Sequence, residues 1–241
     1  LHLLSRRQRQ MCIRDRKETC DMIIYFFKDR SKERVNFGQL IDEYFDKLEN
    51  TVITSNDDEF IATFNIPHFG CSYRYLITKR SRVSSLYRLN PNYVNTFLLC
   101  EFPDDIPQFI TRLILKQIDE LCKMFEFAIY HDKIDNIKEF NMFELIAILN
   151  KERAKYLNEH PEIIKYPVDQ DLLNEVCTYQ SMIDELPSVV KDDIVATPYI
   201  ILKDSQDHVY FSVNWHVGLP TTFPPHLDFV HVEEEENLVN L

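Results

Sequence analysis

Hydrophobic and polar positions in the first part of the chain follow strand and helix periods in turn. The short apolar run Met22–Phe27 is typical of a buried strand. Over Phe37–Leu48 the apolar residues recur at helical spacing, and Asn36 is a suitable N-cap because its side-chain oxygen can accept from free backbone amides. Residues 59–66 and 71–77 alternate on either side of a turn, which predicts a β-hairpin.

The next stretch adds a strand, a helix and a further strand. Thr96–Phe102 predicts a strand that ends at Pro103, and Phe127–Tyr130 predicts another. Between them an apolar stripe follows Pro107, a residue that fits the first turn of a helix. The predicted order is β-α-β-β-β-α-β. The fold class is therefore α+β, a mixed β-sheet with two helices on one face.

The second half of the chain changes period twice. Residues 138–192 have helical spacing interrupted by prolines, and from Pro198 the alternation of a sheet returns. Tyr199–Leu202, Val209–Trp215 and His226–Val232 predict the three strands of a short C-terminal β meander. The domains that we expect are an α+β domain over 22–135, a helical segment over 136–195, the meander packed on the preceding parts over 196–232, and an acidic tail over 233–241.

The first residues differ in composition from everything that follows. Residues 1–18 carry six bases against two acids, a net of +4, whereas the whole chain has a net charge of −12. Met22 opens the first predicted strand and would be a natural start. We expect residues 1–21 to be non-native or disordered, and the alternative is a basic arm that grips nucleic acid.

Acidic residues are missing from one long window of this acidic chain. The chain has 39 Asp and Glu against 27 Lys and Arg, yet no acid lies between Phe60 and Cys100. In a regular strand Tyr73 and Tyr75 face away from Arg74, which assigns the tyrosines to the core. The bases beyond this strand form a predicted cationic rim, Lys79, Arg80, Arg82 and Arg88. We expect the rim to bind an acidic protein segment or this chain's own acidic region.

Glycine and cysteine usage limit the chemistry. Only Gly38, Gly70 and Gly218 are present. Glycine-rich phosphate loops, dinucleotide fingerprints and G-x-S-x-G elbows need several closely spaced glycines, so those enzyme classes are excluded and no cofactor is expected. The six cysteines form no close metal-type pairs, which favours reduced thiols and no metal site. With no apolar stretch near the roughly 20 residues of a membrane span, we expect a cytoplasmic protein without membrane contact.

Histidine and aspartate near the C-terminus provide the best candidate for a chemical site. His226 and Asp228 would project from the same face of a strand, where a carboxylate can orient an imidazole. Adding His216 would give three metal ligands or an acid–base pair. The simpler interpretation is a proline-rich turn whose histidines form hydrogen bonds near the sheet edge.

Three short segments carry a family resemblance: Tyr73–Lys79 (Tyr-Arg-Tyr-Leu-Ile-Thr-Lys), Leu86–Tyr93 (Leu-Tyr-Arg-Leu-Asn-Pro-Asn-Tyr) and Phe223–Phe229 (Phe-Pro-Pro-His-Leu-Asp-Phe). With them the chain resembles an uncharacterised family of bacterial cytosolic proteins from AT-rich, Firmicute-like or mollicute-like genomes, over most of residues 22–232. The resemblance implies a bacterial origin and no known reaction, so no functional residue is carried over from it.

These patterns favour a non-enzymatic cytosolic binding or regulatory protein that docks an acidic partner through its cationic rim. One alternative is a metal-dependent or His/Asp acid–base hydrolase centred on the C-terminal meander, so an enzymatic activity stays open. The other is an RNA-binding protein, which the negative net charge disfavours because it repels phosphate.

Overall fold

A computed structural model describes residues 21–80, 90–103, 106–161, 169–190, 194–206 and 208–233. The described chain divides into two compact units. One consists of residues 21–67 and 71–160, and the other of the residues from Pro161 onward with the turn residues 68–70. Among the described residues, no helix is both long and apolar enough to cross a membrane.

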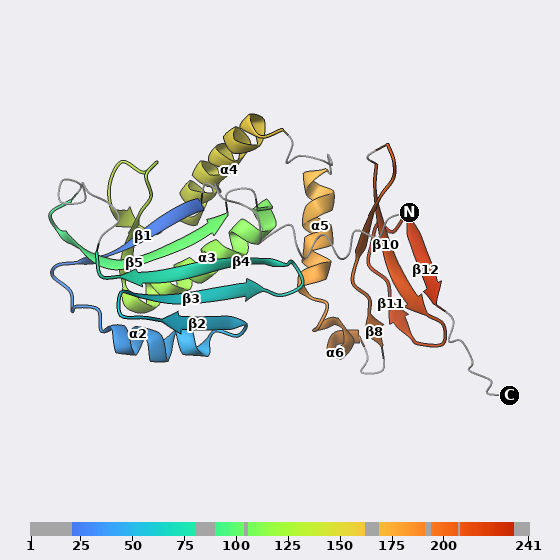
Figure 1. The fold of residues 1–241 in the computed structure, drawn as a ribbon, viewed down its shortest axis with the longest axis horizontal. Helices are drawn as coiled ribbons and strands as arrows, with labels where there is room; N and C mark the ends of the chain where they lie inside the picture. The colour runs from blue at the N-terminus through green and yellow to red at the C-terminus, as the bar shows by residue number, and fades with distance from the viewer. Residues whose placement is uncertain are drawn as a thin grey trace. The chain divides into compact units, whose positions relative to one another are not determined.

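The first unit is built on one large antiparallel sheet (Figure 1). Its strands are β1 (Asp21–Asp29), β2 (Thr51–Ser55), β3 (Glu59–Ile66), β4 (Cys71–Thr78), β5 (Tyr93–Pro103), β6 (Phe127–Tyr130) and β7 (Lys138–Glu139). They are hydrogen-bonded in the order β2-β3-β4-β5-β1-β6-β7, and every neighbouring pair is antiparallel.

The α+β class is confirmed, but the sheet is not mixed. The sequence pattern predicted three strands after the first helix, and the structure has four, because β2 precedes the hairpin β3–β4. Successive strands from β2 to β5 run in opposite directions. One additional strand before β5 therefore reverses the direction of β5 relative to β1. The two strands therefore pair antiparallel, where three strands would have brought them together in parallel. Only Ile53 and Val52 of β2 are large and apolar, and both are exposed, which weakened the signal.

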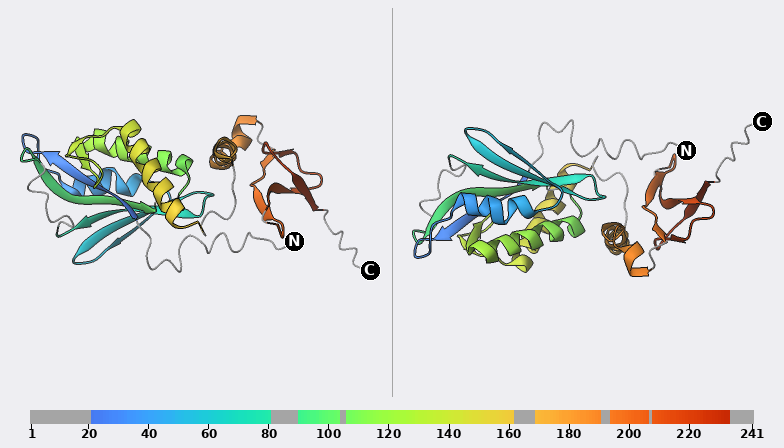
Figure 2. Two further views of the ribbon diagram at one scale, coloured as in Figure 1. Left: turned by 90° about the horizontal axis from the view of Figure 1, so that it is seen from above. Right: turned by 90° about the horizontal axis from the view of Figure 1, so that it is seen from below.

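Two helices cover one face of the sheet, as predicted (Figure 2). Helix α2 (Phe37–Glu43) begins at Asn36, whose side-chain oxygen accepts from Gly38 and Gln39. It ends earlier than the apolar spacing suggested and passes into the 3₁₀ turn η1 (Phe45–Lys47). The longer α3 (Gln108–Phe125) buries a full apolar stripe. A hydrogen bond of 2.9 Å from Tyr44 Oη to the Gln117 carbonyl joins the two helical segments. Helix α4 (Met142–Glu159) packs against α3.

Aromatic side chains form the core between the sheet and these helices. The ring of Tyr75 lies 5.2 Å from that of Phe45 and 6.3 Å from that of Phe26, measured between centroids. Tyr73 and Tyr75 are both buried, while Arg74 between them lies on the opposite face of β4. The pleat therefore assigns the two tyrosines to packing, as the sequence predicted.

A bulge interrupts the pairing of β1 with β5. Tyr25 lies opposite Leu99 and Phe27 lies opposite Asn95, so the stretch from Thr96 to Leu98 bulges opposite a single residue of β1. Phe97 within it has a φ of 60°, which is unfavourable for an aromatic residue. Asn95 Oδ1 accepts from the Phe97 amide over 2.8 Å and so holds this conformation.

The second unit combines two helices with small sheets. Its elements are α5 (Gln170–Ser181), α6 (Leu186–Val190), β8 (Val195–Ala196), β9 (Ile200–Lys203), β10 (Val209–His216), β11 (Thr221–Thr222) and β12 (Phe229–Glu233). The hairpin β9–β10 is antiparallel as predicted, but β12 pairs with β10 in parallel. The predicted meander is therefore wrong, because residues 217–228 carry the chain through β11 and back before β12 begins.

Candidate functional site: a basic pocket at one end of the sheet

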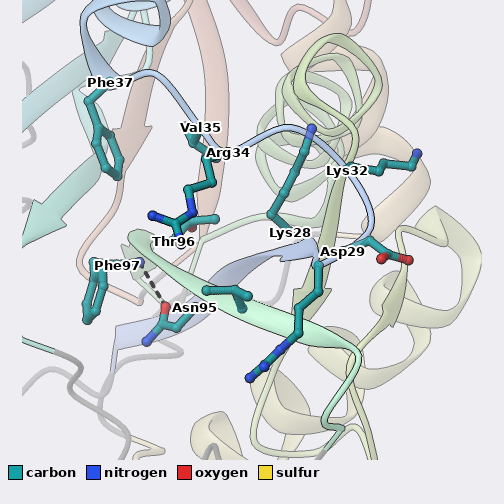
Figure 3. A pocket seen from close by; sticks show the side chains of 11 residues that line it. Lys28, Asp29, Lys32, Arg34, Val35, Phe37, Asn95, Thr96 and Phe97 are labelled. Carbon is teal, nitrogen blue, oxygen red and sulfur yellow. Dashed lines mark hydrogen bonds between the residues drawn. The ribbon is translucent and has the colours of Figure 1, made fainter.

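A pocket of about 660 Å³ lies between the segment that leads from β1 to α2 and the beginning of β5 (Figure 3). We call it the basic pocket, because four of its lining residues are cationic. It is lined by Lys28, Asp29, Arg30, Lys32, Arg34, Val35, Phe37, Val94, Asn95, Thr96 and Phe97. All of these belong to the first unit, so the pocket is defined within one compact body.

Two of the four cations serve to anchor the segment. Lys28 Nζ donates to the Phe125 carbonyl over 2.6 Å and lies 3.3 Å from Glu126 Oε2. Lys32 Nζ lies 2.8 Å from Glu126 Oε1. The hydrogen bond from Lys32 holds the pKa of the Glu126 carboxyl below its usual range and raises the pKa of Lys32 in turn. The two ammonium groups therefore share one carboxylate at the end of α3.

Local hydrogen bonds fix the turn that follows β1. Asp29 Oδ1 accepts from the backbone amide and the hydroxyl of Ser31, both over 2.8 Å. The amide hydrogen bond is the main cause of a lowered pKa for Asp29. The Arg30 amide donates to the Asn92 carbonyl over 2.9 Å, which ties the turn to the start of β5. The backbone at the beginning of the segment is thus held next to the start of β5.

The other two cations, Arg30 and Arg34, are exposed. Neither guanidinium has a hydrogen-bond or ion-pair partner within the part of the chain that the structure describes. Figure 3 shows Arg34 reaching from the loop toward Thr96, while the side chains of Lys28 and Lys32 run in other directions. Arg30 and Arg34 are therefore the groups that can bind an incoming anion.

Apolar side chains border these arginines. Phe97 is 39% exposed and Val94 is 47% exposed, although both lie on a strand of the central sheet. Phe37 and Val35, which line the same pocket, are half-buried. The Thr96 hydroxyl donates to the Phe26 carbonyl over 2.7 Å, so its proton is already used within the fold. The pocket thus offers cationic donors beside an apolar wall.

Two residues of the predicted cationic rim lie at the same end of the sheet as the basic pocket. Strands β1 and β4 are both antiparallel to β5, so their C-terminal ends meet at one end of the sheet (Figure 1). Lys79 and Arg80 follow β4 there and are exposed. Lys79 Nζ lies 3.3 Å from Asp58, an exposed pair of low strength. Arg82 and Arg88 lie outside the described residues. We call Arg30, Arg34, Lys79 and Arg80 the cationic end.

The residues of the alternative chemical site have separate partners. His226 Nε2 lies 2.6 Å from Glu175, and His216 Nδ1 lies 3.2 Å from Glu233. Asp228 Oδ2 accepts from the Phe211 amide over 2.8 Å, which fastens the start of β12 to β10. Across the described ranges, no three His, Cys, Asp or Glu side chains are grouped so that they could hold a metal ion.

Sequence reasoning missed the arginines of the basic pocket, although a signal for them exists. At the end of the first strand and in the loop that follows, every second position is basic: Lys28, Arg30, Lys32 and Arg34. Asp29 and Glu33 between them hide this alternation from any count of net charge. The prediction was instead based on the window without acidic residues, and it therefore placed the binding site at the bases that follow β4.

Comparison with protein-family models gives no match. Searches of the curated proteins and of the solved structures likewise find no match. The resemblance to a bacterial family therefore stays a prediction, and function has to be argued from the geometry of the site.

Proposed function

We propose that this chain is a non-enzymatic binding protein that docks an acidic protein partner at the cationic end. The observation that carries the proposal is the state of Arg30 and Arg34, two exposed guanidiniums without a partner in the described structure, in a chain with a net charge of −12. In such a chain cations are readily paired internally, as Lys28 and Lys32 are. Cations left unpaired beside a pocket are available for an anion from outside.

The arginine side chain suits this role. Its planar guanidinium presents donors that match both oxygens of a carboxylate, so it binds Asp and Glu with defined geometry. The anchored backbone of the turn after β1 supports the proposal further, because a held scaffold lowers the ordering cost of binding. The buried free thiols of Cys100, Cys122 and Cys177 support a reducing, cytosolic location for this activity.

A charge-reversal experiment tests the proposal. The probe is a fluorescein-labelled oligoglutamate peptide, and binding is followed by fluorescence anisotropy at low and moderate salt. We expect Arg30→Glu/Arg34→Glu to weaken binding by at least about tenfold without lowering the melting temperature. The matched control is Lys116→Glu/Lys151→Glu, the same change of charge at two exposed lysines on α3 and α4.

Two outcomes would overturn the proposal. The first is no binding of the probe by the unaltered chain at low salt. The second is equal loss of binding in both double variants, because the effect would then follow net charge and not the cationic end. Oligouridylate serves as a competitor in the same assay. Stronger binding of this RNA than of the peptide would favour the RNA-binding alternative.

A further inference from the structure

We infer that the basic pocket recognises an acidic side chain together with an adjacent large apolar side chain of the same partner segment. This inference rests on the proposed function and narrows it. The partner would carry glutamate or aspartate next to aliphatic or aromatic residues, and a uniformly acidic stretch would bind less well. Three features of the pocket lead to this chemistry: its free donors, its exposed apolar wall and its size.

The polar groups of the pocket that can bind an anion are donors, and Asp29 is the one acidic residue of the lining. Arg30 and Arg34 can only donate. Asn95 uses its side-chain oxygen to accept from the Phe97 amide, so its NH₂ group is the part left for a ligand. One oxygen of Asp29 is occupied by Ser31. A carboxylate, which only accepts, complements this set.

The exposed apolar side chains of the pocket would gain no favourable contact from a ligand that carries only charged groups. Phe97 and Val94 are each more than a third exposed, and Phe37 lines the same pocket. In Figure 3 Phe37 and Phe97 lie on the same side of Arg34. An apolar side chain that followed a bound carboxylate could therefore pack on these rings while the acid reached the guanidinium.

The backbone of Phe97 adds a separate argument. Its φ of 60° lies in a region that aromatic residues avoid and that Gly or Asn would occupy at lower cost. A large exposed aromatic residue at such a position is poorly explained by stability alone. Unfavourable backbone of this kind is concentrated at binding sites, where the side chain that it presents has a use.

The size of the pocket suits an acidic side chain together with a large apolar side chain. A volume of about 660 Å³ falls in the range of sites that take drug-sized organic ligands, and a lone carboxylate would leave most of it to water. Proteins that bind a single nucleic acid strand contact its phosphates along a basic groove. In this pocket Glu126 already pairs with two of the four cations. The pocket is therefore less suited to a nucleic acid strand.

The inference is tested with two labelled peptides and two variants. One peptide carries glutamates followed by leucines, and the other has each leucine replaced by serine. We expect the unaltered chain to bind the leucine peptide about tenfold more tightly, as expected from burying one large apolar side chain. Phe97→Ser should abolish this preference and leave binding of the serine peptide unchanged. Arg34→Gln should weaken binding of both peptides.

The outcomes separate the inference from the proposed function. Equal binding of both peptides by the unaltered chain would overturn the inference and leave acidic docking intact. Binding of neither peptide would overturn both. A leucine preference that persists in Phe97→Ser would also overturn the inference, because the apolar side chain would then bind elsewhere. Circular dichroism on each variant confirms that the comparison is made on folded protein.

Discussion

Arg74 donates from Nε to Oε2 of Glu101 over 2.7 Å, across the pair of strands β4 and β5. The Glu101 side chain is only 4% exposed, whereas that of Arg74 is 47% exposed. The arginine therefore covers a carboxylate that the fold has removed from water. Burial of an acid in the middle of a sheet is tolerated when an ion pair of this geometry accompanies it.

Replacing Arg74 by methionine should destabilise the first unit. The substitution keeps most of the aliphatic contact but leaves the buried Glu101 without its arginine, at a cost of about 2–3 kcal/mol after allowance for the exposure of Arg74. Urea denaturation measures the change. In Arg74→Met/Glu101→Leu the charge is removed as well, and most of the stability should return. A double variant as unstable as Arg74→Met would show that packing, and not the ion pair, sets the loss.

The buried tyrosines provide a matched pair of tests. The Tyr73 hydroxyl is buried and has no hydrogen-bond partner among the described residues. Tyr73→Phe should leave stability unchanged or raise it by up to about 1 kcal/mol, because an unsatisfied polar group is removed. The Tyr44 hydroxyl donates to the Gln117 carbonyl over 2.9 Å, so Tyr44→Phe should cost about 1 kcal/mol. A larger loss in Tyr73→Phe than in Tyr44→Phe would contradict the arrangement.

His131 should make stability fall in mild acid. The side chain is 3% exposed just after β6, and its Nδ1 accepts from the Lys133 amide over 3.2 Å, which requires an unprotonated Nδ1. Burial lowers the pKa of His131 below its ordinary value of 6.5, despite the nearby carboxylate of Asp132.

The direction of the change in stability with pH follows from the difference in proton binding between the folded and the unfolded chain. Between the lowered pKa and 6.5 the unfolded chain binds a proton that the folded chain does not, so the free energy of unfolding falls as the pH drops through this window. Above pH 6.5 the contribution of His131 is constant. Thermal melts over a pH series should show a shallower decline for His131→Gln than for the unaltered chain. Identical slopes would mean that His131 titrates normally when folded.

Phe97→Asn should leave stability equal or higher while it weakens the binding of apolar side chains. Asparagine tolerates a positive φ better than phenylalanine, and relief of this backbone cost is worth about 1 kcal/mol, offset in part by the loss of the buried portion of the ring. The melting temperature should therefore stay equal or increase by a few degrees. A marked decrease would show that the Phe97 ring is needed for folding, and the binding role argued for it would lose its support.

Periodicity predicted the elements that alternate or repeat cleanly. Strands β3 and β4, the N-cap at Asn36 and the burial of Tyr73 and Tyr75 all follow from local pattern, because one face of each element packs against the core. Strand β2 was missed since its apolar residues are exposed and little distinguishes its faces. That single omission turned an antiparallel sheet into a predicted mixed one.

The candidate site was less accessible from the sequence because it depends on long-range pairing. Arg34 and Phe97 are far apart in the chain and meet through the register of β1 with β5. The bulge that exposes Phe97 also has no sequence signature, since the residue in the unfavourable conformation is neither Gly nor Asn. Lys79 and Arg80, in contrast, were singled out from composition alone, because a charged pair at the end of a strand is visible without a fold, and their role in binding stays a prediction.

Glu126 lies outside the lining of the basic pocket, yet its one carboxylate pairs with both Lys28 and Lys32. Exchanging it for glutamine takes a single nucleotide change in any glutamate codon and would remove the negative charge that offsets these two ammonium groups. Affinity for acidic partners could therefore rise in one evolutionary step, with every residue that touches the ligand unaltered. The end of α3 thus gives this lineage a means of adjusting how strongly the chain binds while what it binds stays the same.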